Sequence, residues 1–382
     1  MSDIPANAAF VRLQLSASLP PPGKGARQGR WNLFSGWLNT ALTLLCLYLI
    51  WLLVWPAVKF IFIDAVWTGA SREACLAETA GRAVGACWPF IAAKFSQFIY
   101  GFYPEGGRWR VDLTFLLSAA LLLPLLIPRL PYKGANALVF FGIFPIAAFF
   151  LLVGGGFGLP YVETRSWGGL LITLVVAVTG IVVSLPLGIL LALARRSAMP
   201  AVQAAAVIFI EFWRGVPLIA VLFFATYMLP LFLPPTWSID ALLRVLVGVA
   251  LFASAYMAEV VRGGLQAIPR GQYEAASALG LGYAATMGLV ILPQALRLVI
   301  PGIVNIFIGL FKDTTLVLTV AIFDLLGQLR AAFADPNWAS PATLFTGFAF
   351  AGLIYFVFCF GMSRYSLFVE RRLCTEHSRD VE

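Results

Sequence analysis

The chain has 382 residues, of which 61% are hydrophobic and only 12% are charged, and its mean hydropathy is +0.90. Soluble globular proteins carry about 45–50% apolar and about 25% charged residues, so this composition excludes a water-soluble fold and a disordered chain. It predicts a polytopic membrane protein. The single histidine, His377, argues against a membrane enzyme with haem or histidine-bound metal, and we expect no metal site and no catalytic residues.

Eight stretches with few or no charges are long enough to be candidate membrane spans, although the second has only sixteen residues. They are 31–58, 113–128, 134–162, 166–194, 197–239, 241–258, 297–322 and 336–363. No ten-residue alternation suggests a barrel, so we expect helices. The sequence therefore predicts an all-α polytopic membrane protein with eight spans.

The net charge of +8 has two candidate explanations. Nucleic-acid binding is not expected, because no basic run is interleaved with aromatic residues. Lys and Arg residues are instead retained on the cytoplasmic side of a membrane. With both termini inside, fifteen of them fall on the cytoplasmic side and eight outside, and Arg195 and Arg196 mark the cytoplasmic end of the fourth span. We expect both termini in the cytoplasm.

The chain divides into two parts between a flexible cytoplasmic tail at 1–35 and a cytoplasmic tail at 371–382. Residues 36–160 hold three spans without a polar motif, and residues 165–370 carry every feature with chemical content. No inverted repeat relates the two parts, so the usual signature of secondary transporters is missing.

A long extracytoplasmic loop is expected at 59–112, between the first two spans. It contains Cys75 and Cys87, twelve residues apart. In an oxidising compartment these two residues are candidates for a disulfide. Two unpaired thiols remain the alternative.

The segment between the sixth and seventh spans is rich in small residues. Gly271 is a candidate N-cap, Glu274 suits the positive end of a helix, and Gly280 suits a left-handed cap. We therefore expect a short rigid helix at 272–279. Such a helix either enters a groove on a cytoplasmic partner or forms a tight loop that packs on its own helices.

This segment resembles the EAA signature of binding-protein-dependent ABC importer permeases. In that pattern Glu-Ala-Ala is followed by three residues, Gly, nine residues and Ile-x-Leu-Pro. The matching residues are Glu274, Ala275, Ala276, Gly280, Leu292 and Pro293, with Val290 in place of Ile. Further segments fit the polar-amino-acid (histidine/glutamine-type) permease subfamily; they are 211–218, 254–264, 301–305 and 312–316. The three additional N-terminal spans and their loop look like the longer permeases of general L-amino-acid importers in Gram-negative bacteria.

The resemblance implies a type I importer transmembrane domain with a five-helix core at 165–370. It also implies an inner-membrane location among lipids, a second and distinct permease subunit, two ATPase subunits below and a periplasmic amino-acid-binding protein above. The chain has no G-x-x-x-x-G-K-[ST] motif, so ATP and Mg²⁺ are expected on the partner ATPase and no cofactor on this chain. The residues expected to couple to the ATPase are Gly271, Glu274, Ala275, Ala276, Gly280, Leu292 and Pro293.

Charged residues inside spans are costly and are functional candidates. Glu211 and Arg214 are three residues apart, so they form either a structural ion pair or part of a gate. Glu259 and Arg262 have the same spacing, at the start of the cytoplasmic segment.

A candidate substrate pathway follows one face of the seventh span. Asn305, Gly309 and Lys312 recur at helical spacing. Asn305 either meets the substrate or joins helices as a buried amide. Ile306 stands where relatives often have a polar residue, and the resemblance suggests that this neighbour contacts substrate in some members. We therefore expect weak substrate contacts on this subunit.

The expected function is that of a permease subunit of an ATP-driven amino-acid importer, which catalyses no covalent chemistry itself. Two alternatives remain. One is a membrane scaffold whose short helix binds a partner other than an ATPase, and the other is an ion-coupled secondary transporter.

Overall fold

A computed structural model describes residues 33–379 apart from 35, 128–131, 157 and 235. The predicted tail at 1–35 lies almost wholly outside the described residues. Within the described residues the regular elements are helices, and three isolated β-bridges pair residues outside them. The chain divides into two compact units, residues 1–60 and 61–382.

The first unit contains one long helix, α2 (Trp37–Val58). Its 22 residues are apolar on every side, and none of them is buried within the unit. A helix that is hydrophobic all round is typical of a membrane span.

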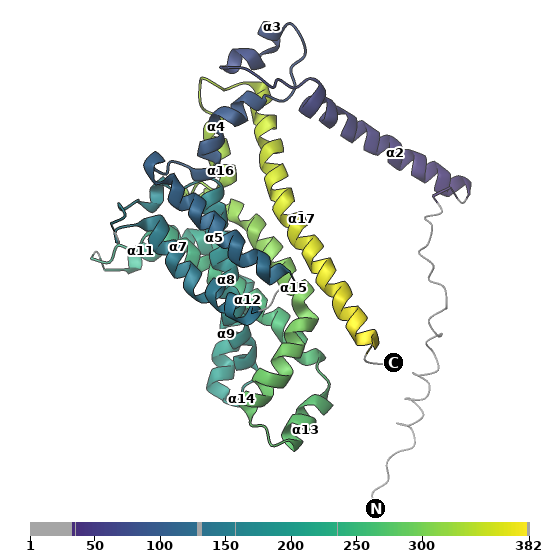
Figure 1. Ribbon diagram of the computed structural model, residues 1–382, viewed down its shortest axis with the longest axis vertical. Coiled ribbons are helices and arrows are strands. Elements are labelled where there is room, and N and C mark those ends of the chain that lie inside the picture. The colour runs from purple at the N-terminus through teal and green to yellow at the C-terminus, as the bar shows by residue number, and fades with distance from the viewer. Residues whose placement is uncertain (1–32, 35, 128–131, 157, 235, 380–382) are drawn as a thin grey trace, which may run out of the picture. The chain divides into compact units, whose positions relative to one another are not determined.

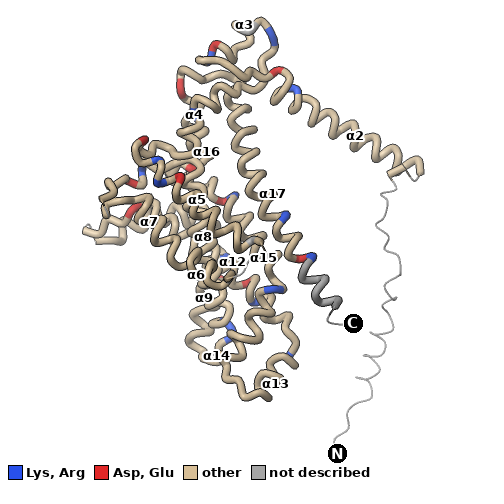
Figure 2. Tube along the Cα trace, in the orientation of Figure 1, with Lys and Arg blue, Asp and Glu red and all other residues tan. Residues whose placement is uncertain are grey.

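The second unit is a helical bundle with a small lobe at one end (Figure 1). The lobe and the helices that follow it are α3 (Ala77–Ala80), α4 (Trp88–Tyr100), α5 (Arg108–Leu126), α6 (Lys133–Leu138) and α7 (Phe144–Val153). The remaining helices are α8 (Leu170–Arg195), α9 (Pro200–Gly215), α10 (Leu218–Phe223), α11 (Leu229–Phe232), α12 (Ala241–Ala267), α13 (Arg270–Ala278), α14 (Tyr283–Ala285), α15 (Leu292–Asp313), α16 (Leu325–Ala332) and α17 (Pro341–Arg379). The long helices are largely uncharged along their middle portions (Figure 2), as a hydrocarbon environment requires.

The structure confirms an all-helical polytopic protein but does not confirm eight spans. Six helical stretches in the described residues are long and apolar enough to cross a membrane, and a bent pair allows up to seven. The six are Trp37–Ile63, Gly134–Val153, Leu170–Arg195, Ala241–Ala267, Tyr283–Val320 and Pro341–Arg371. The predicted second span falls in α5, which is not among them and carries Arg108, Arg110 and Asp112 in its first turns.

Two predicted spans have a different course in the structure. The stretch predicted at 197–239 is bent by 101° between α9 and α10, where Pro217 takes an extended conformation before α10. The span predicted at 297–322 begins earlier, at Tyr283, and passes through a π-helical turn before Pro293. Proline lacks an N–H and its ring crowds the carbonyl four residues earlier, so the turn before Pro293 widens and the helix continues.

Glycines allow α12 to pack closely against its neighbours α8 and α15. A Cβ atom on Gly188 of α8 would lie 2.6 Å from the Met257 side chain of α12. A Cβ atom on Gly264 would lie 2.6 Å from the Ala295 carbonyl oxygen of α15. Small residues at such crossings are typical of membrane helix packing. This packing holds the end of α12, and with it the start of α13, at a defined place.

The lobe comprises residues 61–87, which precede α4. It is closed by a disulfide between Cys75 and Cys87, whose Cα atoms are 5.7 Å apart. Both cysteines are at most 2% exposed. The backbone N–H of Cys87 donates to the Thr346 hydroxyl oxygen of α17 at 2.8 Å. Lys94 pairs with Asp335 at 2.5 Å, and its hydrogen bond lowers the pKa of that carboxyl group. The lobe and α4, which carries Lys94, are therefore both fastened to the α16–α17 region.

Replacing Cys75 and Cys87 together with serine is expected to destabilise the lobe by about 3 kcal/mol. The bond closes a loop across a sequence separation of 12 residues, and losing it restores the entropy of the unfolded segment. Limited proteolysis of the membrane-embedded protein should then cut within 64–88 faster than in the wild type. Replacing the exposed Cys46 with serine is the control and should leave the cleavage rate unchanged. Equal cleavage in all three proteins would contradict the prediction.

Candidate functional site

Helix α13 lies with α14 at the end of the second unit that is farthest from the lobe (Figure 1). One side of it packs inward, where Ala276 is 2% exposed and Tyr273 is half-buried. Glu274 and Ala275 are exposed on the other side, and Leu279 is 80% exposed. The helix thus presents a carboxylate, a small side chain and a bare leucine outward.

The C-terminal end of α13 has the cap that the sequence predicts. Gly280 has φ +73°, and its N–H donates to the Ser277 carbonyl at 2.9 Å. The N–H of Leu281 donates to the Ala276 carbonyl at 3.1 Å. These two bonds form a Schellman motif, which satisfies carbonyls that the helix leaves free.

The prediction that Gly271 caps the N-terminal end is wrong. The helix begins at Arg270, and Pro269 precedes it with an extended ψ of 144°. The carbonyl of Pro269 accepts the N–H of Gln272 at 3.1 Å, so the helix starts two residues earlier than expected. Gly271 lies inside the helix, exposed and with open space beside its Cα atom.

Replacing Gly280 with alanine is expected to destabilise the end of α13 by about 1 kcal/mol, because L-residues are strained at positive φ. The amide of Leu281 should then exchange its hydrogen about five-fold faster, which hydrogen-exchange mass spectrometry can measure. Gly282→Ala is the matched control, since Gly282 has φ −68° and also has open space beside it. Equal exchange in the two variants would contradict the prediction.

A cluster of five charged residues lies where α8, α9 and α12 meet. We call it the Glu259 cluster; its members are Arg195, Glu211, Arg214, Glu259 and Arg262. Glu259, whose side chain is 16% exposed, accepts hydrogen bonds from Arg195 at 2.7 Å and from Arg262 at 2.6 Å and 3.1 Å. Arg214 approaches the same carboxylate at 3.7 Å.

Glu211 and Arg214 do not pair with each other, contrary to one of the two expectations for them. Glu211 instead accepts a hydrogen bond from Arg195 at 2.9 Å. Arg214 turns toward Glu259 and lies 5.8 Å from the ring centre of Tyr256. Arg195 is less exposed than Arg214, and Glu259 is less exposed than Glu211. Because ion pairs are stronger in less solvated surroundings, Glu211 pairs with Arg195 and Arg214 turns toward Glu259.

The candidate pathway residues lie on α15. Asn305 and Lys312 are exposed, and Gly309 between them has open space beside its Cα atom. Ile306 points elsewhere, because it packs partly buried against the core formed by α8, α12 and α15. In this single chain the face with Asn305, Gly309 and Lys312 is therefore open to another molecule.

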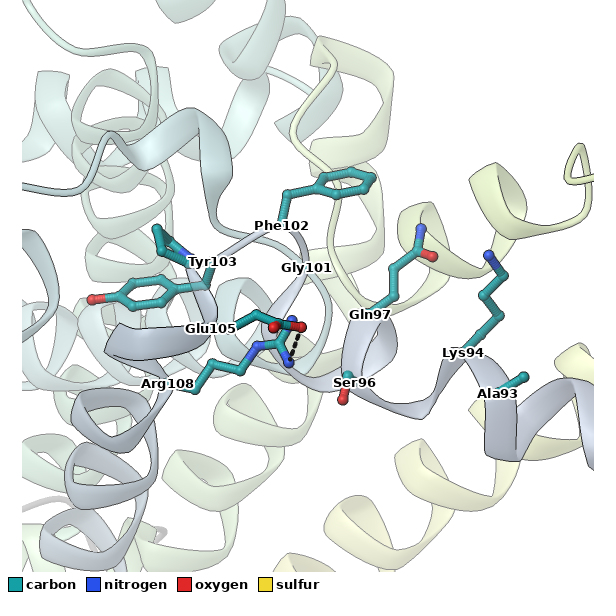
Figure 3. Close-up of a pocket in the computed structure, with 10 residues that line it drawn as sticks. Ala93, Lys94, Ser96, Gln97, Gly101, Phe102, Tyr103, Glu105 and Arg108 are labelled. Atoms are coloured by element: carbon teal, nitrogen blue, oxygen red, sulfur yellow. Dashed lines mark ion pairs between the residues drawn. The ribbon is translucent and has the colours of Figure 1, made fainter.

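A separate pocket of about 390 Å³ lies beside the lobe, between α4 and the start of α5 (Figure 3). Two of the side chains that line it are cationic. Lys94 is paired with Asp335, and Arg108 is paired with Glu105 at 3.3 Å. Since both cations already have carboxylate partners, we assign no ligand to this pocket.

Residues 184–374 match the family described as binding-protein-dependent transport system inner membrane component. The inner membrane amino-acid ABC transporter permease protein YhdY of Escherichia coli (strain K12) is 53% identical, over 91% of this chain and 92% of its own length. The chain belongs to this family.

Other members of the family are also similar to the chain. The glutamate/glutamine/aspartate/asparagine transport system permease protein BztC of Rhodobacter capsulatus is 42% identical, over 97% of this chain and 99% of its own length. The probable glutamine permease protein GlnP of Bacillus subtilis is 32% identical, over 52% of this chain and 88% of its own length. A solved amino acid ABC transporter chain is 31% identical over 53% of this chain, with a TM-score of 0.47.

Family membership confirms the resemblance drawn from the EAA pattern. The matched segment begins within α8 and ends within α17, so it contains α13, the Glu259 cluster and the open face of α15. The chain is thus a membrane subunit of a binding-protein-dependent ABC transporter, a multi-pass protein of the inner membrane and not an enzyme.

Two arginines within the matched segment, Arg195 and Arg196, make contacts that were not predicted from the sequence. The sequence pattern indicates only a role in topology for both, whereas Arg195 joins the Glu259 cluster and Arg196 contacts α12 and α13. The signal that could have indicated these contacts is their position, since two adjacent cations end a long helix that has no other charge.

Proposed function

We propose that this chain is the permease subunit of an ATP-binding-cassette importer that moves L-amino acids across the bacterial inner membrane. Alternating access would be driven by a partner ATPase. The observation that carries the proposal is α13, an exposed short helix with the EAA residues, which projects between two long apolar helices. The substrate class is supported by the amino-acid permeases among the relatives.

The arrangement that fits this function places α13 in the cytoplasm as the coupling helix, with Leu292 and Pro293 at the start of α15 supporting it. Both termini then lie in the cytoplasm, and the disulfide lobe lies outside, where a binding protein docks. Eight spans result if α5 and the bent pair α9–α11 each count as one. A distinct second permease would pair with the domain at 165–370, and ATP and Mg²⁺ would bind to the partner ATPase.

Purification of the complete transporter tests this function. The ATPase should co-purify with this chain, and vesicles containing the complex should import amino acids in the presence of ATP and binding protein. Uptake should be insensitive to an uncoupler. Failure to recover an ATPase would favour the scaffold alternative, and uptake that needs an ion gradient would favour a secondary transporter.

The pathway proposal rests on the open face of α15. Asn305→Ala should raise the KM for uptake about five-fold, the effect of losing one hydrogen bond of about 1 kcal/mol, while ATPase activity is retained. The measurement is initial uptake against substrate concentration, with ATP hydrolysis followed in parallel. Unchanged uptake kinetics would exclude Asn305 and leave the substrate contacts to the second permease.

A further inference from the structure

Two adjacent arginines at the end of α8 reach in different directions. Successive residues of a helix are about 100° apart around its axis, so neighbouring side chains do not share a face. Arg195 is the last residue of α8, and Arg196 is its C-cap. One rigid helix end can therefore hold two separate sets of partners.

Arg196 holds the coupling segment. Its guanidinium donates to the Leu265 carbonyl oxygen in the last turn of α12 at 3.1 Å and to the Tyr273 hydroxyl oxygen of α13 at 3.1 Å. The guanidinium carbon also lies 5.7 Å from the ring centre of Tyr273. Carbonyls in the last turn of a helix lack intrahelical donors. The Arg196 guanidinium therefore caps the end of α12 at Leu265 and also binds α13 through the Tyr273 hydroxyl group.

Arg195 holds the Glu259 cluster. Its two terminal nitrogens donate to two carboxylates on different helices, Glu259 of α12 at 2.7 Å and Glu211 of α9 at 2.9 Å. A planar guanidinium fixes both directions at once, which an ammonium group does not. Glu211 lies shortly before the 101° bend that leads into α10.

We propose that Arg195 and Arg196 are positioning residues that transmit displacement of α13 to α9 and α12. The inference rests on the proposed function and deepens it. A shift of α13 pulls on Arg196 through Tyr273. Because Arg195 is the next residue on the same helix, the shift moves Glu259 and Glu211 together. The bend between α9 and α10 then changes its angle in step with the ATPase.

The test uses the complete transporter in vesicles, with ATP hydrolysis and amino-acid uptake measured on the same sample. The variants are Tyr273→Phe, which keeps the ring and removes the hydroxyl group, Arg196→Gln, and the two together. Tyr161→Phe is the control, since that tyrosine is 64% exposed in the loop before α8, at the other end of this helix. Recovery of the ATPase and the thermal midpoint are recorded for each complex.

Each single variant should still co-purify with the ATPase subunit. The number of amino acids imported per ATP hydrolysed should fall about five-fold, a typical size for a coupling effect. The double variant should be no worse than the poorer single variant, because each change removes the hydrogen bond between Arg196 and the Tyr273 hydroxyl group. An unchanged ratio in Tyr273→Phe overturns the proposal, even if both rates fall in proportion. A wild-type complex without ATP-driven uptake would instead reject the proposed function, so the two failures are distinguishable.

Discussion

Replacing Glu259 with glutamine is expected to destabilise the permease by about 3 kcal/mol. The carboxylate is 16% exposed and serves three arginines, Arg195, Arg214 and Arg262. Removing one partner of a buried ion pair costs about 3–5 kcal/mol, because the remaining charges lose their compensation. We expect the lower end of this range, since Arg214 and Arg262 are about one third exposed. Thermal unfolding of the purified protein in detergent measures the effect.

Glu211→Gln is the matched control for this prediction. Glu211 belongs to the same cluster, but its side chain is 54% exposed and its ion pair is with Arg195. Exposed pairs contribute about 0–1 kcal/mol, so its midpoint should fall far less. Similar losses in the two variants would mean that Glu259 does not hold the cluster together.

Replacing Glu274 with lysine is expected to lower recovery of the ATPase at least about ten-fold while the permease still inserts. Glu274 is exposed on α13, so the reversal of charge leaves the packing of Ala276 and Tyr273 intact. Misplaced charge at a docking surface costs several kcal/mol, and about 1.4 kcal/mol already corresponds to ten-fold in affinity. The measurement is the molar ratio of ATPase to permease after affinity purification.

Glu78→Lys provides the control for the change of charge. Glu78 is exposed on α3 in the disulfide lobe, at the other end of the second unit (Figure 1). It should leave the ratio of ATPase to permease at the wild-type value. Equal recovery from Glu274→Lys and wild type would remove α13 as the docking element.

The local features of the candidate site could be predicted from the sequence because they depend on near neighbours. Gly280 ends α13 since only glycine takes a positive φ without strain, and the alanines before it favour a helix. The spacing of Asn305, Gly309 and Lys312 likewise places them on one face whatever surrounds the helix. The predicted start of α13 was wrong by two residues, because Pro269 and not Gly271 precedes the helix.

The long-range features could not be predicted in this way. Spacing favours Glu211 with Arg214, but the approach of α8 and α12 supplies other partners, and that approach depends on tertiary packing at glycines such as Gly188. A π-helical turn joins the helix that begins at Tyr283 to α15, whereas the sequence analysis assigned the residues before Pro293 to the cytoplasmic segment and began the span at 297. Arg196 and Tyr273 are far apart in sequence, and no periodicity relates them.

The packing of the lobe and α4 against α16 limits where the chain can be divided into fragments or joined into chimeras. Phe90 and Phe98 of α4 are fully buried against Leu325 and Leu329 of α16, in a core that residues from both sides of position 184 build together. A fragment restricted to residues 184–374 would lack Phe90 and Phe98, so the apolar surface of Leu325 and Leu329 would be exposed and would favour aggregation. Chimeras with shorter permeases should therefore exchange the lobe, α4, α16 and α17 as one block.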